Sequence, residues 1–223
     1  MRCNYPGTEG TVVEYHWDAP VITNNGYIAR NPSRKLIIVS FRGSAVLGDW
    51  VEDFTESPVY WPESVAGSTV VLGVLGGYLV SSKHILQGTA KLAEAYPDYA
   101  IVAVGHSLGG SRASMFVADF VLRHPQYAAR VQMYTYGQAK SGNRAFADFM
   151  NGLGVPIYRA VNRGDIVPHL PLTDTRLVHF GTEVWTTLSN RIVACPNTDY
   201  SRCSNSLPLP AYSTSDHSTY FGL

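Results

Sequence analysis

The chain lacks any excess of charge of one sign. Its 223 residues carry 17 basic and 17 acidic side chains, so the formal net charge is zero when the histidines are neutral. Nothing in this balance points to nucleic acid or an anionic membrane as an electrostatic partner. Long apolar runs are also missing, since none approaches the roughly 18 residues of a membrane-spanning helix, and the opening residues do not resemble a signal peptide. Any contact with a lipid surface must therefore be apolar in origin.

Cysteine is scarce, with three in the whole chain. Three are too few for a disulfide-built scaffold, and the spacing of Cys195 and Cys203 matches no zinc motif. The residues between these two are polar and turn-rich, as in a loop that a disulfide closes. We therefore favour a Cys195–Cys203 bridge over free thiols, which leaves Cys3 either free or paired outside this chain.

The length and the 45% hydrophobic content fit one globular domain over residues 1–223, with a buried sheet-and-helix core. Strand-like and helix-like segments alternate along most of the chain. This alternation predicts an α/β fold with a mainly parallel central sheet and helices on both faces. The predicted strands are 11–17, 21–29, 35–41, 99–104, 131–136, 155–161 and 177–186, and the predicted helices are 77–96, 107–122 and 143–150.

One segment carries a chemical signal. The sequence Gly105-His106-Ser107-Leu108-Gly109-Gly110 follows a predicted strand and opens a predicted helix. A serine between glycines at such a turn is typical of the nucleophile elbow of serine hydrolases, because neighbouring backbone leaves no room for larger side chains there. The helix N-terminus behind the serine favours developing negative charge. A glycine-rich turn that happens to contain serine is the alternative.

A serine nucleophile requires a histidine base and a carboxylate that orients it, and in α/β-hydrolases the acid precedes the histidine. His217 is the favoured base, because it lies in a terminal loop that can fold over the sheet edge. Asp165 is the favoured acid, because it follows a predicted strand through a short loop. The alternatives set aside are His124, His169 and His179 for the base, and Asp148, Asp174 and Asp216 for the acid.

Several motifs in a fixed order resemble the fungal class 3 lipases, a family of secreted triacylglycerol lipases that also contains feruloyl esterases. Beside the elbow, they are Ile38-Val39-Ser40-Phe41-Arg42-Gly43-Ser44, Tyr136-Gly137-Gln138, Gly142-Asn143, Asn162-Arg163-Gly164-Asp165-Ile166-Val167-Pro168 and Asp216-His217-Ser218-Thr219-Tyr220-Phe221. The resemblance implies the α/β-hydrolase fold, with Ser107, Asp165 and His217 as the catalytic triad. It also implies an oxyanion hole made by Ser44, through its N–H and hydroxyl, and by the N–H of Leu108.

The resemblance further implies a secreted enzyme whose leader is absent from this chain, with no metal or organic cofactor. We expect a monomer. The chain departs from the family in lacking an amino-terminal helix and a tail beyond the histidine, and in carrying Arg112 after the elbow. The missing tail would explain the unpaired Cys3, whose family counterpart often pairs with a carboxyl-terminal cysteine.

A short amphipathic segment follows Ser44. Its apolar residues fall at helical spacing on one face: Val46, Leu47, Trp50, Val51 and Phe54. The resemblance makes this helix, at about residues 45–55, a lid that opens at an oil–water interface. An ordinary surface helix is the alternative. Because the family's feruloyl esterases have a more polar segment here, lipid esters are the favoured substrates. A soluble-ester esterase and a non-catalytic lipid-binding protein remain the rival hypotheses.

Overall fold

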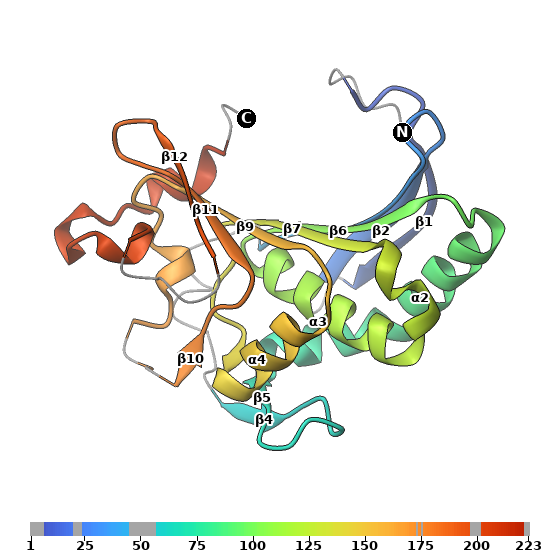
Figure 1. Ribbon diagram of the computed structural model, residues 1–223, viewed down its shortest axis with the longest axis horizontal. Coiled ribbons are helices and arrows are strands. Elements are labelled where there is room, and N and C mark those ends of the chain that lie inside the picture. Colours follow the sequence, from blue (N-terminus) through green and yellow to red (C-terminus); the bar gives the residue numbers. More distant parts are fainter. Residues whose placement is uncertain are drawn as a thin grey trace.

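An eight-stranded sheet forms the centre of the molecule (Figure 1). The computed structural model describes residues 7–19, 24–44, 57–172, 174, 176–196 and 202–220. The strand order is β1-β2-β3-β6-β7-β9-β11-β12. The bounds are β1 Val12–Ala19, β2 Asn24–Asn31, β3 Leu36–Phe41, β6 Ala100–His106, β7 Val131–Tyr136, β9 Ile157–Asn162, β11 Thr182–Thr186 and β12 Ile192–Cys195.

The five strands from β3 to β11 pair in parallel, whereas β1, β2 and β12 are added antiparallel at the two edges. Every second residue of β3 is fully or almost fully buried, namely Ile37, Val39 and Phe41. These side chains belong to one large core that also contains Tyr78 and Phe116 from the helices. The mainly parallel sheet confirms the predicted α/β class, and its architecture is that of an α/β-hydrolase.

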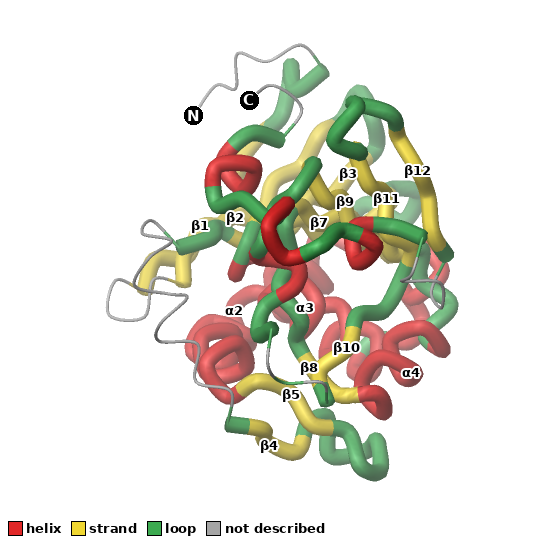
Figure 2. Tube along the Cα trace, turned by 90° about the vertical axis from the view of Figure 1, so that its left-hand side faces the viewer, coloured by secondary structure: helices red, strands yellow, loops and turns green. Residues whose placement is uncertain are grey.

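The three α-helices of the described residues lie on one face of this sheet, where we expected helices on both (Figures 1 and 2). They are α2 Leu72–Ala95, α3 Leu108–Arg123 and α4 Arg144–Gly152. Strand order explains the difference. From β3 through β6 and β7 to β9 the order advances in one direction only, and right-handed crossovers in one direction place every connecting helix on the same face.

A small second sheet lies beyond the helices, with the strand order β10-β8-β5-β4. Its strands are β4 Pro58–Tyr60, β5 Thr69–Val71, β8 Gly142–Asn143 and β10 Leu177–Val178. The single strand predicted over residues 177–186 is therefore wrong, because β10 and β11 belong to different sheets. Between them the backbone turns at Gly181, which has φ +69°.

Helix α2 begins five residues earlier than predicted, at Leu72 rather than Gly77. Its first turns bury Val74 and Leu75, but the low helix propensity of Gly76 and Gly77 hides this start in the sequence. Within the described ranges, no helix is both long and apolar enough to cross a membrane.

Candidate active site

Ser107 lies on the turn between β6 and α3, and its backbone is in an unusual conformation, with φ 57° and ψ −131°. Such positive φ values strain residues other than glycine and occur at functional turns. The neighbouring glycines are required by space. A Cβ on Gly105 would lie 2.3 Å from the backbone of Gly109, and one on Gly109 would lie 2.3 Å from the carbonyl oxygen of Phe41. The serine is therefore held on a tight strand-to-helix turn.

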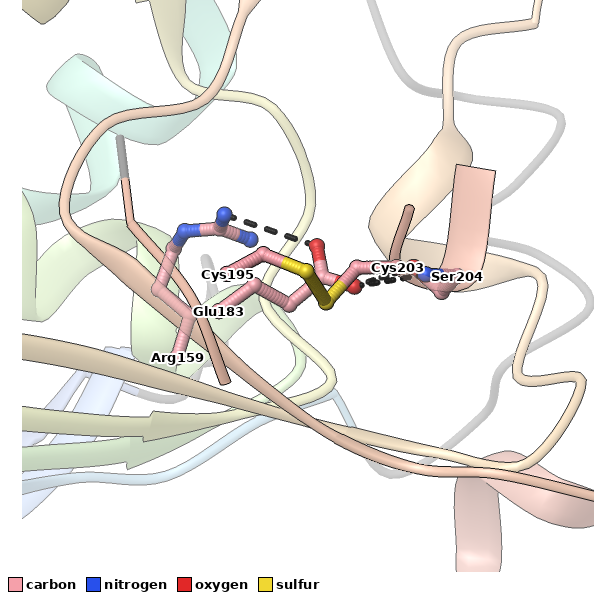
Figure 3. The surroundings of a disulfide bond; sticks show 5 residues. All are labelled: Arg159, Glu183, Cys195, Cys203 and Ser204. Carbon is pink, nitrogen blue, oxygen red and sulfur yellow. Dashed lines mark hydrogen bonds and ion pairs between the residues drawn. A yellow bond between two sulfur atoms is a disulfide. The ribbon is translucent and has the colours of Figure 1, made fainter. Parts of the chain in front are cut away.

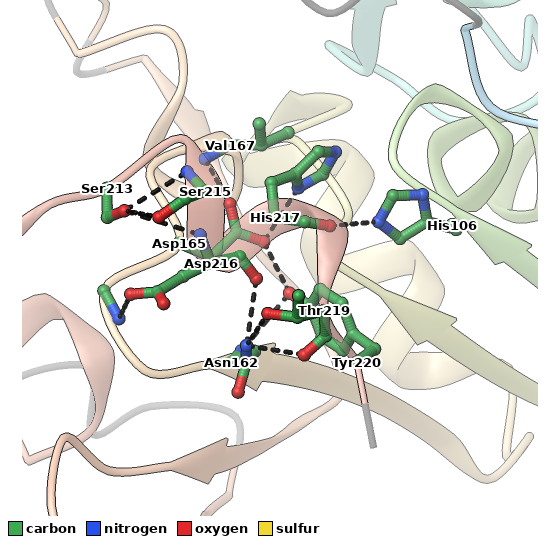
Figure 4. A network of polar contacts seen from close by, with 11 residues as sticks. His106, Asn162, Asp165, Val167, Ser213, Ser215, Asp216, His217, Thr219 and Tyr220 are labelled. Carbon is green, nitrogen blue, oxygen red and sulfur yellow. Dashed lines mark hydrogen bonds and ion pairs between the residues drawn. The ribbon is translucent and has the colours of Figure 1, made fainter. Parts of the chain in front are cut away.

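Asp165 and His217 meet, although 52 residues separate them in the chain (Figure 4). Asp165 follows β9 after two residues, Arg163 and Gly164, and His217 lies in the short 3₁₀ helix η6, Ser215–Ser218. The Nδ1 atom of His217 is 2.8 Å from Oδ2 of Asp165. Both residues are buried, with exposed fractions of 3% and 0%. The pair therefore has the geometry of a histidine oriented by a buried carboxylate.

The other ring nitrogen of His217 is available. Its Nε2 is buried and has no hydrogen-bond partner among the described residues. The ring of His217 stacks against that of His106, with 4.4 Å between the ring centroids. Because His106 immediately precedes Ser107, the structure brings the histidine ring beside the elbow.

Two further groups hold the carboxylate of Asp165, and neither has a role that the sequence predicts. The backbone N–H of Val167 donates to Oδ1 at 2.9 Å, and the hydroxyl of Tyr220 donates to Oδ2 at 2.5 Å. Burial, followed by the charge of Asp165, raises the pKa of Tyr220 well above its usual value. Tyr220 therefore keeps its proton and remains a donor. Its position three residues after His217, in a motif shared with the family, is the signal that could have pointed to it.

The loop that carries the acid also holds the segment that carries the base (Figure 4). The side-chain amide of Asn162 donates to the carbonyl oxygens of Asp216 and Thr219, at 2.9 and 2.8 Å. The backbone N–H of Gly164 donates to the Asp216 carboxylate at 3.0 Å. Asp216, one of the alternatives for the acid, thus joins η6 to the loop after β9.

The turn after β3 lies against the elbow, where the oxyanion hole is expected. A Cβ on Gly43 would lie 2.8 Å from the carbonyl oxygen of His106 and 3.1 Å from Cβ of Ser107. The next residue, Ser44, is half-buried, and Leu108 is the buried first residue of α3. Ser44 and His106 also line a hollow of about 410 Å³. The expected lid residues Val46, Leu47, Trp50, Val51 and Phe54 lie outside the described residues.

The predicted bridge between Cys195 and Cys203 is confirmed (Figure 3). Next to it, Ser204 donates to one carboxylate oxygen of Glu183 from its N–H at 2.9 Å and from its hydroxyl at 2.6 Å. The other oxygen of Glu183 lies 3.5 Å from the buried guanidinium of Arg159. The disulfide loop is thereby tied to β9 and β11. Cys3 lies outside the described residues.

The rejected histidines have structural partners. The Nε2 atom of His179 lies 2.6 Å from the carbonyl oxygen of Pro168, and Nδ1 of His169 lies 2.8 Å from the side-chain oxygen of Asn205. His124 packs against the rings of Phe120 and Tyr127 at the far end of α3. In the part of the chain that the structure describes, no group of three or more histidine, cysteine or acidic side chains could hold a metal ion.

The fold and these side chains define the class: an α/β-hydrolase with a serine on the strand-to-helix turn and a buried histidine–carboxylate pair beside it. The sequence model of the family described as Lipase (class 3) matches residues 38–175, and the chain belongs to this family.

Three relatives illustrate the likeness. A lipase from Rhizomucor miehei is 34% identical over 97% of this chain and 60% of its own length. The secreted mono- and diacylglycerol lipase A of Penicillium cyclopium is 31% identical over 84% of this chain and 61% of its own. A solved triacylglycerol lipase, whose catalytic centre is described as a serine protease triad, is 35% identical with a TM-score of 0.91, over 96% of this chain and 82% of its own. The chain thus spans less than two thirds of the first two relatives.

Proposed function

We propose that this protein is a serine hydrolase of carboxylic esters, with Ser107 as nucleophile, His217 as base and Asp165 as the orienting acid. The observation that carries the proposal is the buried Asp165–His217 hydrogen bond, 2.8 Å long, beside the strained turn at Ser107. With Nδ1 of His217 occupied by the carboxylate, its unpartnered Nε2 is the nitrogen that takes the serine proton.

The reaction proceeds through an acyl-enzyme. The Ser107 hydroxyl oxygen attacks the ester carbonyl as Nε2 of His217 accepts the proton, and the same histidine returns this proton to the departing alcohol. Water then attacks the acyl-enzyme, again with His217 as base, and the carboxylic acid leaves. Asp165 stabilises the imidazolium that forms in each half of the reaction.

The negative charge of each tetrahedral intermediate requires donors aimed at the oxyanion. The N–H of Leu108, at the start of α3, supplies one, and the N–H of Ser44, with its hydroxyl, supplies the other. Two observations support this assignment: the turn at Gly43 touches the elbow, and the positive end of the α3 dipole lies behind it. Removal of one such donor typically lowers the rate by about 10²–10³-fold.

Triacylglycerol is the proposed substrate, met at an oil–water interface by a secreted monomer. The names of the relatives support acylglycerols. The sequence supports a lid, because apolar residues recur on one face of residues 45–55. Soluble phenolic esters such as feruloyl esters are the alternative. Hydrolysis of emulsified tributyrin and of methyl ferulate should be compared, and faster turnover of methyl ferulate would contradict the lipid assignment.

The catalytic proposal is tested by Ser107→Ala and Asp165→Asn against wild type, on tributyrin below and above its solubility limit. We expect Ser107→Ala to lose activity at both concentrations, while wild type gains rate sharply above the limit if residues 45–55 form a lid. Full activity of Ser107→Ala would overturn the assignment of the nucleophile. A smooth saturation curve through the limit would overturn the lid alone.

A further inference from the structure

His106 contacts the base in two separate ways. It is the last residue of β6 and directly precedes Ser107. Its ring stacks on the ring of His217, with centroids 4.4 Å apart and planes inclined by 32°. Its Nε2 atom lies 2.8 Å from the backbone carbonyl oxygen of His217 (Figure 4). One side chain therefore touches both the ring and the main chain of the same residue.

The hydrogen bond fixes the proton on His106. A carbonyl oxygen can only accept, so Nε2 of His106 must carry the hydrogen and donate it. The carbonyl concerned belongs to η6, a four-residue turn whose last carbonyls have no partner within the turn itself. His106 thus gives the carbonyl oxygen of His217 a hydrogen-bond partner, which this oxygen would otherwise lack.

The neutral form of His106 suits this place. Burial, followed by the nearby His217, lowers the pKa of His106 below its usual value. A neutral ring still donates from Nε2, and it places no second positive charge beside the imidazolium that forms on His217 during catalysis. The ring of Tyr220 packs edge-to-face with the same ring, with centroids 5.5 Å apart.

Asp165 alone does not fix the orientation of His217. Their hydrogen bond holds one ring atom, Nδ1, and does not by itself set the inclination of the ring plane, which depends on the groups packed against the ring. The stacked ring of His106 restrains the plane, and the bond to the carbonyl oxygen restrains the main chain of η6. Ser107 directly follows His106 in the chain. These contacts therefore fix the position of His217 relative to Ser107.

We propose that His106 is a positioning residue, which holds the ring of His217 in the orientation from which Nε2 can accept the proton of Ser107. This inference rests on the proposed serine mechanism. It assigns His106 no contact with substrate and no proton transfer. Its effect belongs to the rate of the chemical step, because a displacement of about 1 Å in a reacting group can lower the rate by roughly 100-fold.

Two variants separate the two contacts. His106→Phe keeps a ring for stacking and removes the donor, whereas His106→Gln keeps an N–H donor at similar reach and removes the ring. His124→Phe is the matched control, because His124 also stacks on aromatic rings but lies at the opposite end of α3 from Ser107. Each protein is assayed on the soluble ester p-nitrophenyl butyrate, with active sites counted by fluorophosphonate titration.

We expect kcat per titrated site to fall about 10- to 100-fold in His106→Phe with KM within about twofold of wild type. His106→Gln should recover part of that loss, and His124→Phe should match wild type. The low-field proton signal of the Asp165–His217 hydrogen bond should shift or broaden in His106→Phe and stay unchanged in His124→Phe. A residue that only aids folding would reduce the number of titrated sites and leave kcat per site intact.

The possible failures are distinguishable. Wild-type kcat per site in both His106 variants, with Ser107→Ala inactive, would overturn the role of His106 and leave the serine mechanism standing. Full activity in Ser107→Ala would overturn the proposed mechanism itself.

Discussion

At the scale of single residues, the site depends on a few groups that must be small or must donate. Gly105 must lack a side chain because the α3 backbone is too close, and Tyr220 must keep its hydroxyl because the carboxylate of Asp165 accepts from it. These two requirements differ in kind. The first concerns whether the turn can form, and the second concerns how well the formed site works.

Gly105→Ala is expected to destabilise the protein by more than about 2 kcal/mol, because its Cβ would lie 2.3 Å from the backbone of Gly109. Gly73→Ala in α2 is the control. Nothing lies within 4 Å of its Cβ, so the better helix propensity of alanine should stabilise by about 0.5–1 kcal/mol. Urea unfolding measures both changes. Equal stabilities of the two variants would contradict the crowding described at the elbow.

Tyr220→Phe removes one donor to Asp165 and keeps the ring that packs on His106. A hydrogen bond to a charged group contributes about 1.5–3 kcal/mol, so we expect a loss of up to this size in stability. We also expect kcat to fall roughly tenfold, because the acid that orients His217 is less firmly held. Tyr158→Phe serves as control, since Tyr158 is exposed and stacks on Tyr134 away from the site. Unchanged kcat and stability in Tyr220→Phe would show that its hydroxyl plays no part in holding Asp165.

At the scale of elements, local patterns predict the described helices and most strands of the central sheet, but they miss β12 and the short strands β4, β5 and β8. They also give no information on long-range pairing. The elbow is visible because strand, glycines and helix are adjacent in sequence. The contact between His106 and the carbonyl of His217 joins residues 111 positions apart. The spacing of apolar residues in the sequence gives no sign of such a contact. The apolar spacing of residues 177–186 predicts one strand, because it does not reveal that the chain turns at Gly181 into a different sheet.

The same limit explains the placement of the helices. Their number follows from helical spacing, but the face they cover depends on the strand order, which only the fold reveals. The order of residues in this class leads the sequence to propose Asp165 and His217 as acid and base, and the structure brings these two side chains together. The groups that hold them, Tyr220 and Asn162, act through contacts made only after folding.

The loop closed by the disulfide leads to a prediction about the free energy of unfolding. Closing a loop between Cys195 and Cys203 contributes about 2–3 kcal/mol by restricting the unfolded chain. We expect Cys203→Ser to lower the free energy of unfolding by this amount, as measured in urea. Ser204→Ala removes one of the two bonds to the Glu183 carboxylate and should cost about 1.5–3 kcal/mol, as expected for a hydrogen bond to a charged group. An unchanged free energy of unfolding in Cys203→Ser would contradict the contribution given to the disulfide.

At the scale of the whole molecule, buried histidines link stability to pH. Burial, with the charge of Arg159 next, lowers the pKa of His179 well below its usual 6.5, and burial lowers that of His169. The unfolded chain therefore binds more protons than the folded one as the pH falls below 6.5, and stability is lost in that direction. Above this pH both states hold neutral histidines, and these residues add no pH dependence.

We therefore expect the urea midpoint to fall between pH 7 and pH 5, by an amount that His179→Phe reduces. Each group with a lowered pKa contributes at most about 1.4 kcal/mol per pH unit inside its window. His124→Phe is the control, because its ring stacks at the far end of α3. An identical pH dependence in His179→Phe and wild type would contradict the role given to His179.

The proposed mechanism requires that Ser107, activated by His217, forms a covalent intermediate. Intact-protein mass spectrometry after reaction with a fluorophosphonate, followed by peptide mapping, detects such an adduct. We expect one adduct per chain, on the peptide that carries Ser107, with no adduct in Ser107→Ala and strongly slowed labelling in His217→Ala. Labelling of a different residue, or equal labelling rates in wild type and His217→Ala, would contradict it.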